Sequence, residues 1–164
     1  MSDDHILPRL RRSKFGRLLR DDQIRALAGI AVCEQLPAGV EVFCEGSQAE
    51  ALWVICEGTI AIQLDSGDEP RAVIQTLCEP ELLGWSALVG DGLMSATALT
   101  TTETTLLRLP ADALKDLCIA DHTLGYAVMG TIAATLNSRL AIARQQAARR
   151  KTPTGEQPHA ARLC

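Results

Sequence analysis

The stretch of sequence that decides the fold is LPAGVEVFCEGSQAEALWVICEGTIAIQL, residues 36–64. Three short segments in it are rich in apolar and β-branched residues, as strands are: GVEVF (39–43), ALWVIC (51–56) and TIAIQL (59–64). The connections EGSQ and EG place glycine where a tight turn needs a positive φ. The stretch therefore predicts consecutive antiparallel strands joined by short turns.

The same pattern continues for another 45 residues. Further strand-like segments are RAVIQTL (71–77), SATALTT (95–101) and TTLLRL (104–109), with DSGDEP and GDG as turn-forming connections. No long helical segment separates these strands, which favours an antiparallel sandwich or barrel over a parallel sheet. The predicted fold class is mainly β with flanking α-helices.

Helical periodicity flanks the strands on both sides. Residues 10–30 predict two short helices, the second capped by Asp21 or Asp22. PADALKDLC (110–118) predicts a short helix, and residues 121–150 predict a long one. At about 1.5 Å per residue the long helix would span about 45 Å, so part of it is predicted to project from the domain or to pair.

Length and charge predict one domain with distinct segments. We expect a basic N-terminal arm (1–20), a β-roll (21–120), a long C-terminal dimerisation helix (121–150) and a disordered tail (151–164). Residues 1–20 carry six basic and two acidic residues, 21–138 carry four and seventeen, and 139–164 carry six and one. The resulting charges of +4, −13 and +5 describe an acidic body with basic ends. We expect a protein partner to meet the acidic body or the basic arms, with solvated surfaces as the alternative.

The sequence predicts a cytoplasmic protein without a membrane span. No run approaches the roughly 20 apolar residues that a spanning helix needs, and the N-terminus lacks the features of a secretory signal.

Six cysteines occur without a Cys-x-x-Cys pair, and we expect them to be free and structural, with a thiolate metal or redox site as the alternative: Cys33, Cys44, Cys56, Cys78, Cys118 and Cys164. Neither a metal nor a cofactor is predicted.

The quoted stretch resembles the opening of the cyclic nucleotide-binding domain family, of the catabolite activator and protein kinase A regulatory subunit type. Gly39, the Val42-Phe43 pair, Glu45-Gly46 and Glu57-Gly58 occur in the order and spacing of that family. The resemblance extends over residues 21–145. It implies an antiparallel, jelly-roll-like β-roll with N-terminal helices and a long C-terminal helix.

Residues 81–99, ELLGWSALVGDGLMSATAL, resemble the phosphate-binding cassette of that family. Trp85 stands where the family has its ribose-binding glutamate, and Met94 stands where it has its phosphate-binding arginine. The candidate ligand-binding residues are Gly84, Trp85, Ser86, Ala87, Met94, Ser95, Ala96 and Thr97. Because losing one partner of a buried charge pair costs about 2–5 kcal/mol, we do not expect ordinary cAMP binding. Trp85 and Met94 either fill the former pocket or line an apolar pocket for another flat ligand.

The long helix carries apolar residues at alternating steps of three and four, the spacing of a coiled-coil seam. The predicted homodimer interface consists of Tyr126, Met129, Ala133, Leu136, Leu140 and Ala143, continued by Ala147. A second stripe formed by Leu124, Val128 and Ile132 is expected to pack on the roll. The alternative is a helix that lies back along its own domain.

The sequence gives less support to two other functions, a hydrolase and a DNA-binding protein. GWSAL lacks the final glycine of a nucleophile elbow, and His122 is the one histidine distant from both ends, so we expect no catalytic residue and no enzyme activity. About fourteen residues follow Arg150, too few for a helix-turn-helix, so we do not expect nucleic acid as a partner. The sequence predicts a non-catalytic regulatory or scaffolding module that acts through protein contacts. The alternatives are a sensor of a small molecule, such as a weakly bound nucleotide, and a haem or redox sensor.

Overall fold

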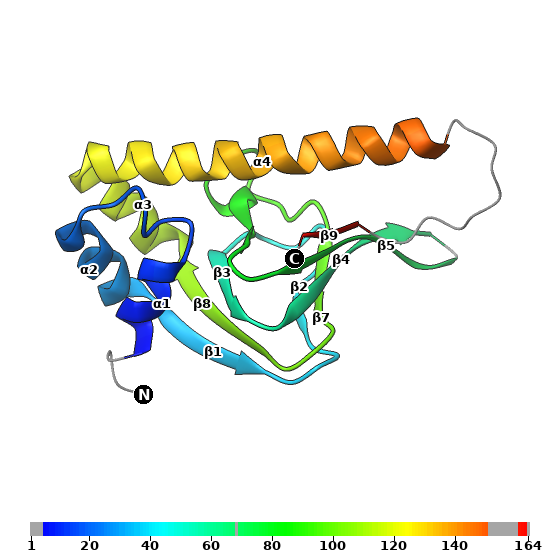
Figure 1. Ribbon diagram of the computed structural model, residues 1–164, viewed down its shortest axis with the longest axis horizontal. Helices are drawn as coiled ribbons and strands as arrows, with labels where there is room; N and C mark the ends of the chain where they lie inside the picture. Colours follow the sequence, from blue (N-terminus) through cyan, green and yellow to red (C-terminus); the bar gives the residue numbers. More distant parts are fainter. Residues whose placement is uncertain (1–4, 68, 151–160, 164) are drawn as a thin grey trace.

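The computed structural model describes residues 5–67, 69–150 and 161–163, and shows two β-sheets with helices on one side (Figure 1). In chain order the elements are α1 (Ile6–Arg12), α2 (Asp21–Ile30), β1 (Val32–Leu36), β2 (Glu41–Phe43), β3 (Ala51–Glu57), β4 (Thr59–Ser66), β5 (Glu69–Cys78), β6 (Leu82–Leu83), the short 3₁₀ helix η2 (Trp85–Ala87), β7 (Thr97–Thr100), β8 (Thr104–Pro110), α3 (Ala111–Ala120), α4 (His122–Arg150) and β9 (Ala161–Leu163).

The sheets have the strand orders β1-β8-β3-β6 and β2-β7-β4-β5-β9. The pairs among β1 to β8 are antiparallel, and β9 lies parallel to β5. The predicted antiparallel β-roll with flanking helices is confirmed. The tail prediction is wrong for residues 161–163, because they pair with β5, while the rest of 151–164 lies outside the described residues.

Strand β3 is buried on both of its faces, which explains its unbroken apolar sequence. Leu52 and Val54 belong to a core between this sheet and the helices, whereas Trp53 and Ile55 belong to a second core between the two sheets. Gly58 connects β3 to β4 with a φ of +91°, and a Cβ atom there would lie 2.4 Å from the carbonyl oxygen of Glu103. This turn therefore requires glycine.

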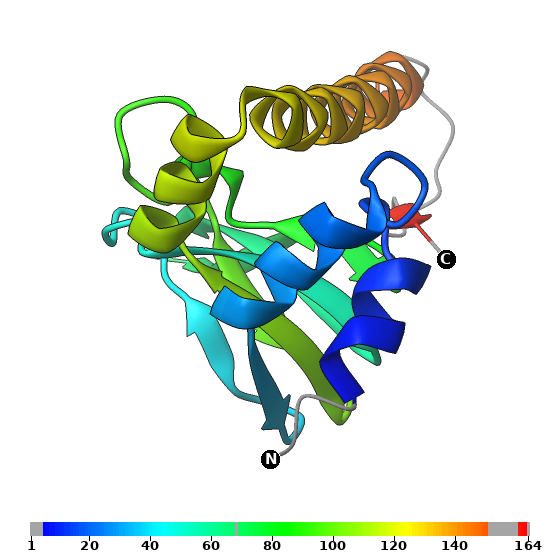
Figure 2. The same cartoon turned by 90° about the vertical axis from the view of Figure 1, so that its left-hand side faces the viewer.

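The N-terminal segment packs into the helical core and does not form a separate arm. Its buried apolar side chains are Ile6, Leu10, Phe15 and Leu19. Figure 2 shows the segment lying beside the other helices and against the sheet. Several of its cations pair with the acidic body of the same chain: Arg9 with Glu57 at 3.4 Å, Arg11 with Asp21 at 2.5 Å and Lys14 with Glu81 at 2.5 Å. The charge pattern sets residues 1–20 apart, whereas packing joins residues 6–19 to the rest of the domain.

Helix α2 begins differently from the prediction. Arg20 is its N-cap residue, and the backbone N–H of Arg20 donates to Gln23 Oε1 at 3.0 Å. Asp21 and Asp22 lie in the first turn instead of capping it, where their charges still favour the helix dipole. The prediction of an aspartate cap is therefore wrong.

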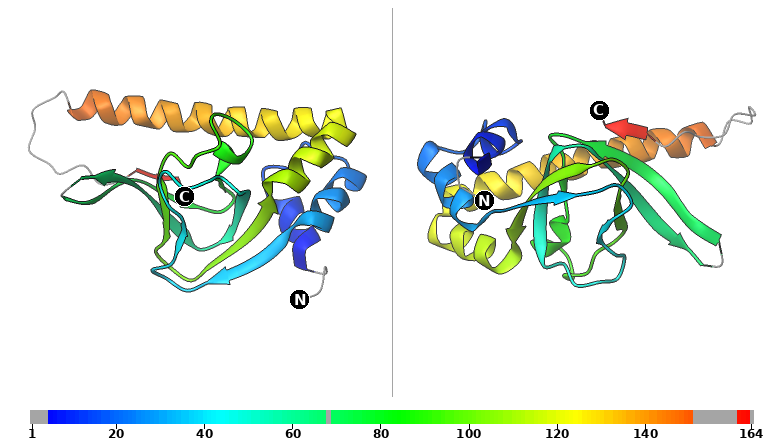
Figure 3. Two further views of the ribbon diagram at one scale, coloured as in Figure 1. Left: turned by 180° about the vertical axis from the view of Figure 1, so that it is seen from behind. Right: turned by 90° about the horizontal axis from the view of Figure 1, so that it is seen from below.

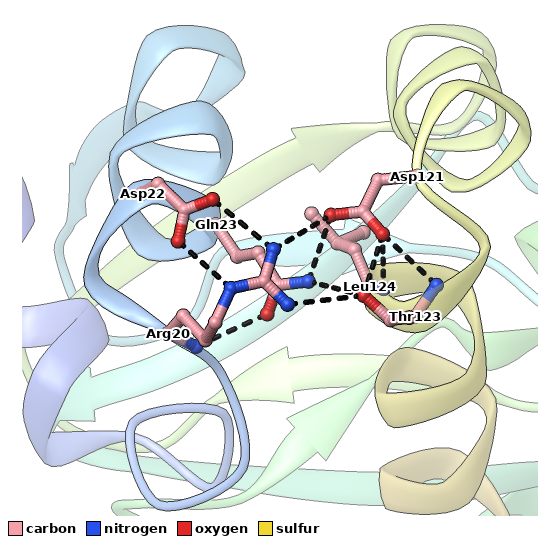
Figure 4. Close-up of polar contacts among 6 residues, drawn as sticks. All are labelled: Arg20, Asp22, Gln23, Asp121, Thr123 and Leu124. Carbon is pink, nitrogen blue, oxygen red and sulfur yellow. Dashed lines mark hydrogen bonds and ion pairs between the residues drawn. The ribbon is translucent and has the colours of Figure 1, made fainter.

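Asp121 joins α2 to the start of α4 (Figure 4). Its Oδ1 accepts hydrogen bonds from the backbone N–H groups of Thr123 at 2.9 Å and Leu124 at 3.1 Å. Its Oδ2 accepts one from Gln23 Nε2 at 2.8 Å and lies 3.4 Å from the guanidinium of Arg20. The hydrogen bond from Gln23, followed by those from Thr123 and Leu124, holds the pKa of Asp121 well below its usual range.

Asp121→Asn is expected to lower the melting temperature at pH 7, because the amide loses acceptor capacity at a capping position. Since the folded state depresses this pKa, the stabilisation is present above the unfolded pKa of about 4 and is lost as the pH falls towards the folded value. The difference between wild type and variant should therefore shrink in acid, as measured by thermal unfolding across the pH range. Asp116→Asn, on the exposed surface of α3, is the matched control. A constant difference down to acid pH would contradict the assignment.

Helix α4 lies along the roll for most of its length (Figures 1 and 3). The predicted inner stripe is confirmed: Leu124, Val128 and Ile132 are at most 2% exposed. Towards the C-terminus Thr135 is buried, and Ile142 is half-buried. The helix thus lies back along its own domain while its opposite face stays exposed. No helix in the described ranges is long and apolar enough to cross a membrane.

Candidate functional site

The cassette begins at a glycine turn held against β3. β6 pairs with β3 in the register Trp53 to Leu83, and Gly84 follows with a φ of +79°. A Cβ atom on Gly84 would lie 2.7 Å from Trp53 Cε3 and 2.8 Å from the carbonyl oxygen of Ala51. The indole ring of Trp53 therefore packs directly on the cassette. Sequence analysis missed this contact, because position 53 lies in the middle of a predicted strand, far from the cassette in the chain.

The second half of the cassette is tied to the loop after β2. The N–H of Gly46 donates to the carbonyl of Met94 at 2.8 Å, and the N–H of Met94 donates to the carbonyl of Ser47 at 2.8 Å. The hydroxyl of Thr97 accepts a hydrogen bond from the N–H of Glu45 at 3.0 Å. Thr97 is buried and fixes this loop, whereas Ser95 is exposed. Of the candidate residues Ser95 and Thr97, Thr97 thus has a hydrogen-bond partner within the protein.

Met94 fills the space between the two sheets. It is 3% exposed and belongs to the core that contains Trp53, Ile55 and Ile62. The position where the family resemblance implies an arginine is therefore apolar in both its side chain and its surroundings. The burial of Met94 supports the interpretation that its side chain fills the former pocket.

Trp85 lies in the other core and not beside Met94. It is half-buried against the helical core, and the guanidinium carbon of Arg139 lies 4.2 Å from the centroid of its ring. This geometry is a cation–π contact. The two residues therefore do not form one shared lining, because Gly84 turns the chain between the two cores. Of the remaining cassette residues, Ala87 is buried, while Ser86 and Ala96 are half-buried.

A buried charge cluster next to the cassette was missed by sequence reasoning. Glu81 precedes β6, and its Oε1 lies 2.5 Å from Lys14 Nζ, while its Oε2 lies 3.7 Å from a terminal nitrogen of Arg139. The Arg139 guanidinium also donates to the carbonyl of Leu82. Burial lowers the pKa of Arg139 to about 10, and Glu81 opposes this effect. The charge pattern placed Arg139 at the start of a basic end, and only the approach of α4 to the cassette pairs it with Glu81.

The predicted seam residues lie on the outer face of α4. Tyr126 is 84% exposed, Met129 42%, Leu136 37% and Leu140 48%, and Ala133 and Ala143 are also exposed. The fold thus leaves this stripe without a partner in the described part of the chain. Dimerisation through it stays a prediction.

Four cysteines are free thiols in the described part of the chain. Cys33, Cys44, Cys56 and Cys118 are free and half-buried, and burial raises the pKa of Cys56 to about 12. No cluster of three metal-ligating side chains occurs among the described residues. Cys78 is disulfide-bonded, so the expectation that every cysteine is a free thiol is wrong, because pairing depends on spatial proximity that sequence spacing does not reveal.

An antiparallel roll with a glycine-turn cassette, flanking helices and a long C-terminal helix is the arrangement that the sequence resemblance implies. Residues 33–121 match the model of the cyclic nucleotide-binding domain, and these residues make up more than half of the chain. The chain belongs to the cyclic nucleotide-binding domain family.

Solved structures share this fold. A cyclic nucleotide-binding domain from Methylobacillus flagellatus is 22% identical with a TM-score of 0.77, covering 95% of this chain and 86% of that one. The N-terminal domain of a transcriptional regulator from Streptomyces coelicolor is 26% identical with a TM-score of 0.65, covering 82% and 94%. A mutant regulatory subunit of a cAMP-independent protein kinase A from Trypanosoma brucei, bound to cAMP in the A site, is 16% identical with a TM-score of 0.69, covering 81% and 46%. No curated protein matches the chain.

Proposed function

We propose that this protein is a non-catalytic regulatory or scaffolding module that acts through protein contacts and does not bind cAMP in the manner of its family. The observation that carries this proposal is Met94, which is 3% exposed in an apolar core at the position implied for the phosphate-binding arginine. A thioether offers a phosphate neither a charge nor a strong hydrogen bond.

The surroundings of Met94 do not compensate for the missing cation. The space is shared with Trp53, Ile55 and Ile62, and residues 21–138 carry a net charge of −13. Burying an anion without a charged or hydrogen-bonding partner is costly. A cyclic phosphate would therefore have to displace packed apolar side chains and gain no ionic contact.

The contact between α4 and the cassette supports a role that does not need a ligand. Arg139 stacks on Trp85, donates to the carbonyl of Leu82 and pairs with Glu81. These contacts hold the long helix on the roll while the space beneath the cassette is filled by the protein's own side chains. The outer face of α4 then presents the seam at Leu136 and Leu140 to a second copy of the chain.

Wild-type protein is expected to show no saturable binding of cAMP or cGMP below about millimolar concentration in isothermal titration calorimetry. The double variant Trp85→Glu with Met94→Arg restores the two side chains of the family cassette. We expect it to gain at least about thirtyfold in affinity, the smaller of the effects expected from regaining one buried charge partner. The similar trypanosomal mutant carries three substitutions, one of which introduces an arginine, and it binds cAMP.

Circular dichroism checks that both proteins retain the β-roll. Ser95→Ala in the wild-type background serves as the control for adventitious contacts at the exposed hydroxyl. A micromolar dissociation constant for wild type that is abolished by Ser95→Ala would overturn the proposal and favour a nucleotide sensor.

A further inference from the structure

A cavity opens beside Trp53, and its lining lies outside the cassette residues 81–99. It has a volume of about 360 Å³ and is lined by Glu34, Val42, Phe43, Ser47, Gln48, Glu50, Trp53 and Arg108. These residues come from β1, β2, β3, β8 and the loop after β2. The volume lies within the range of small-molecule sites. The residues of the cassette do not line this cavity.

The cavity contains an ion pair that is only loosely closed. Arg108 Nε lies 4.0 Å from Glu34 Oε1, and the two side chains are 30% and 31% exposed. A tight arginine–carboxylate pair has bonds of about 2.7–2.9 Å. Within the described part of the chain, the guanidinium of Arg108 donates no hydrogen bond. Its donors therefore remain available to a carboxylate that enters the cavity.

Acidic groups face the same space. Glu34 accepts a hydrogen bond from Trp53 Nε1 at 3.4 Å, which leaves most of its acceptor capacity free. Glu50 lines the cavity from the loop before β3 and is exposed. Two carboxylates and one guanidinium favour a ligand that carries a cationic group as well as an anionic one.

The apolar wall of the cavity is aromatic. The rings of Phe43 and Trp53 are tilted by 36° with their centroids 5.3 Å apart. The six-membered part of the Trp53 ring packs on Gly84, while its N–H points to Glu34. A ligand that enters the cavity should therefore shift the NMR signal of the indole N–H.

We propose that this cavity binds a small zwitterion of the α-amino-acid type with an apolar side chain. Arg108 binds the carboxylate, Glu34 and Glu50 bind the ammonium group, and the wall of Phe43 and Trp53 contacts the side chain. None of the cassette residues lines this site, so the proposal does not rest on the proposed function.

The test uses L-phenylalanine as the probe and follows the indole N–H signals of ¹⁵N-labelled protein by NMR. The Trp53 signal is the one that remains in Trp85→Phe. We expect a saturable shift of this signal, with a dissociation constant in the low millimolar range. The analogues 3-phenylpropionate and 2-phenylethylamine, which lack the ammonium and the carboxylate respectively, should each bind at least about tenfold more weakly.

Arg108→Gln and Glu34→Gln should each weaken L-phenylalanine binding by about tenfold or more, and Arg25→Gln on the exposed surface of α2 should leave it unchanged. The analogue comparison on wild type decides the question if a variant fails to fold. Absence of a saturable shift up to about 20 mM, equal binding by Arg108→Gln, or equal binding of 3-phenylpropionate would overturn the proposal.

Discussion

Protein carrying both Leu136→Asp and Leu140→Asp is expected to be monomeric at concentrations where the wild type is a dimer. Both leucines lie on the outer face of α4 and are 37% and 48% exposed in the single chain. In a parallel coiled coil they would be buried against their counterparts. Each aspartate would place an unpaired charge in that apolar seam, which strongly disfavours association.

Light scattering at tens of micromolar protein measures this effect. Ala141→Asp is the matched control, because residue 141 is exposed on the same helix and lies off the seam. This control should remain dimeric, and the β-roll should stay folded in every variant, since none of the changed residues is buried in the chain. A monomeric wild type, or a double variant that remains dimeric, would show that α4 is not the interface.

Glu81→Gln is expected to reduce the free energy of unfolding by about 3 kcal/mol. The substitution keeps the size of the side chain but leaves Lys14 and Arg139 without their shared anion. Removing one member of a buried pair costs about 3–5 kcal/mol. We expect the lower end of this energy range, because the Lys14 side chain is 28% exposed and water screens part of its charge. The Arg139 side chain is 11% exposed and is screened less.

Urea unfolding followed by circular dichroism measures this change. Glu57→Gln is the control, because the Glu57 side chain is 68% exposed where it pairs with Arg9, and such surface pairs contribute about 0–1 kcal/mol. An equal decrease in the free energy of unfolding in Glu81→Gln and Glu57→Gln would contradict the assignment of Glu81 to a stabilising buried charge cluster. Loosening of α4 should accompany the loss in Glu81→Gln and can be followed by limited proteolysis.

The strands were predictable because their signals are local. Residues 51–56 and 59–64 are apolar segments separated by a glutamate and a glycine, and the structure forms β3 and β4 there with a turn at Gly58. The inner stripe of α4 was predictable for the same reason, since a helix of 3.6 residues per turn places Leu124, Val128 and Ile132 on one face.

The sequence located the cassette but did not reveal where its side chains lie. The sequence alone shows that Trp85 and Met94 differ from the residues that the family has at these positions. It does not show that the two side chains pack into different cores. Which core a residue enters depends on the turn at Gly84 and on the approach of α4, and both depend on contacts between segments far apart in the chain. The contact between the Trp53 ring and the cassette was not predictable either, because the two are about thirty positions apart in the chain.

The sequence by itself determined the antiparallel roll, the flanking helices, the family and the loss of the cassette arginine, because turn residues, periodicity and motif spacing act over a few neighbouring residues. Only the tertiary structure decided that the basic N-terminal segment pairs with the acidic body and that Arg139 reaches Glu81 and Trp85. It also placed Glu34 and Arg108 on adjacent strands around one cavity. These contacts join residues separated by tens of positions, and burial sets their strength, so no local pattern encodes them.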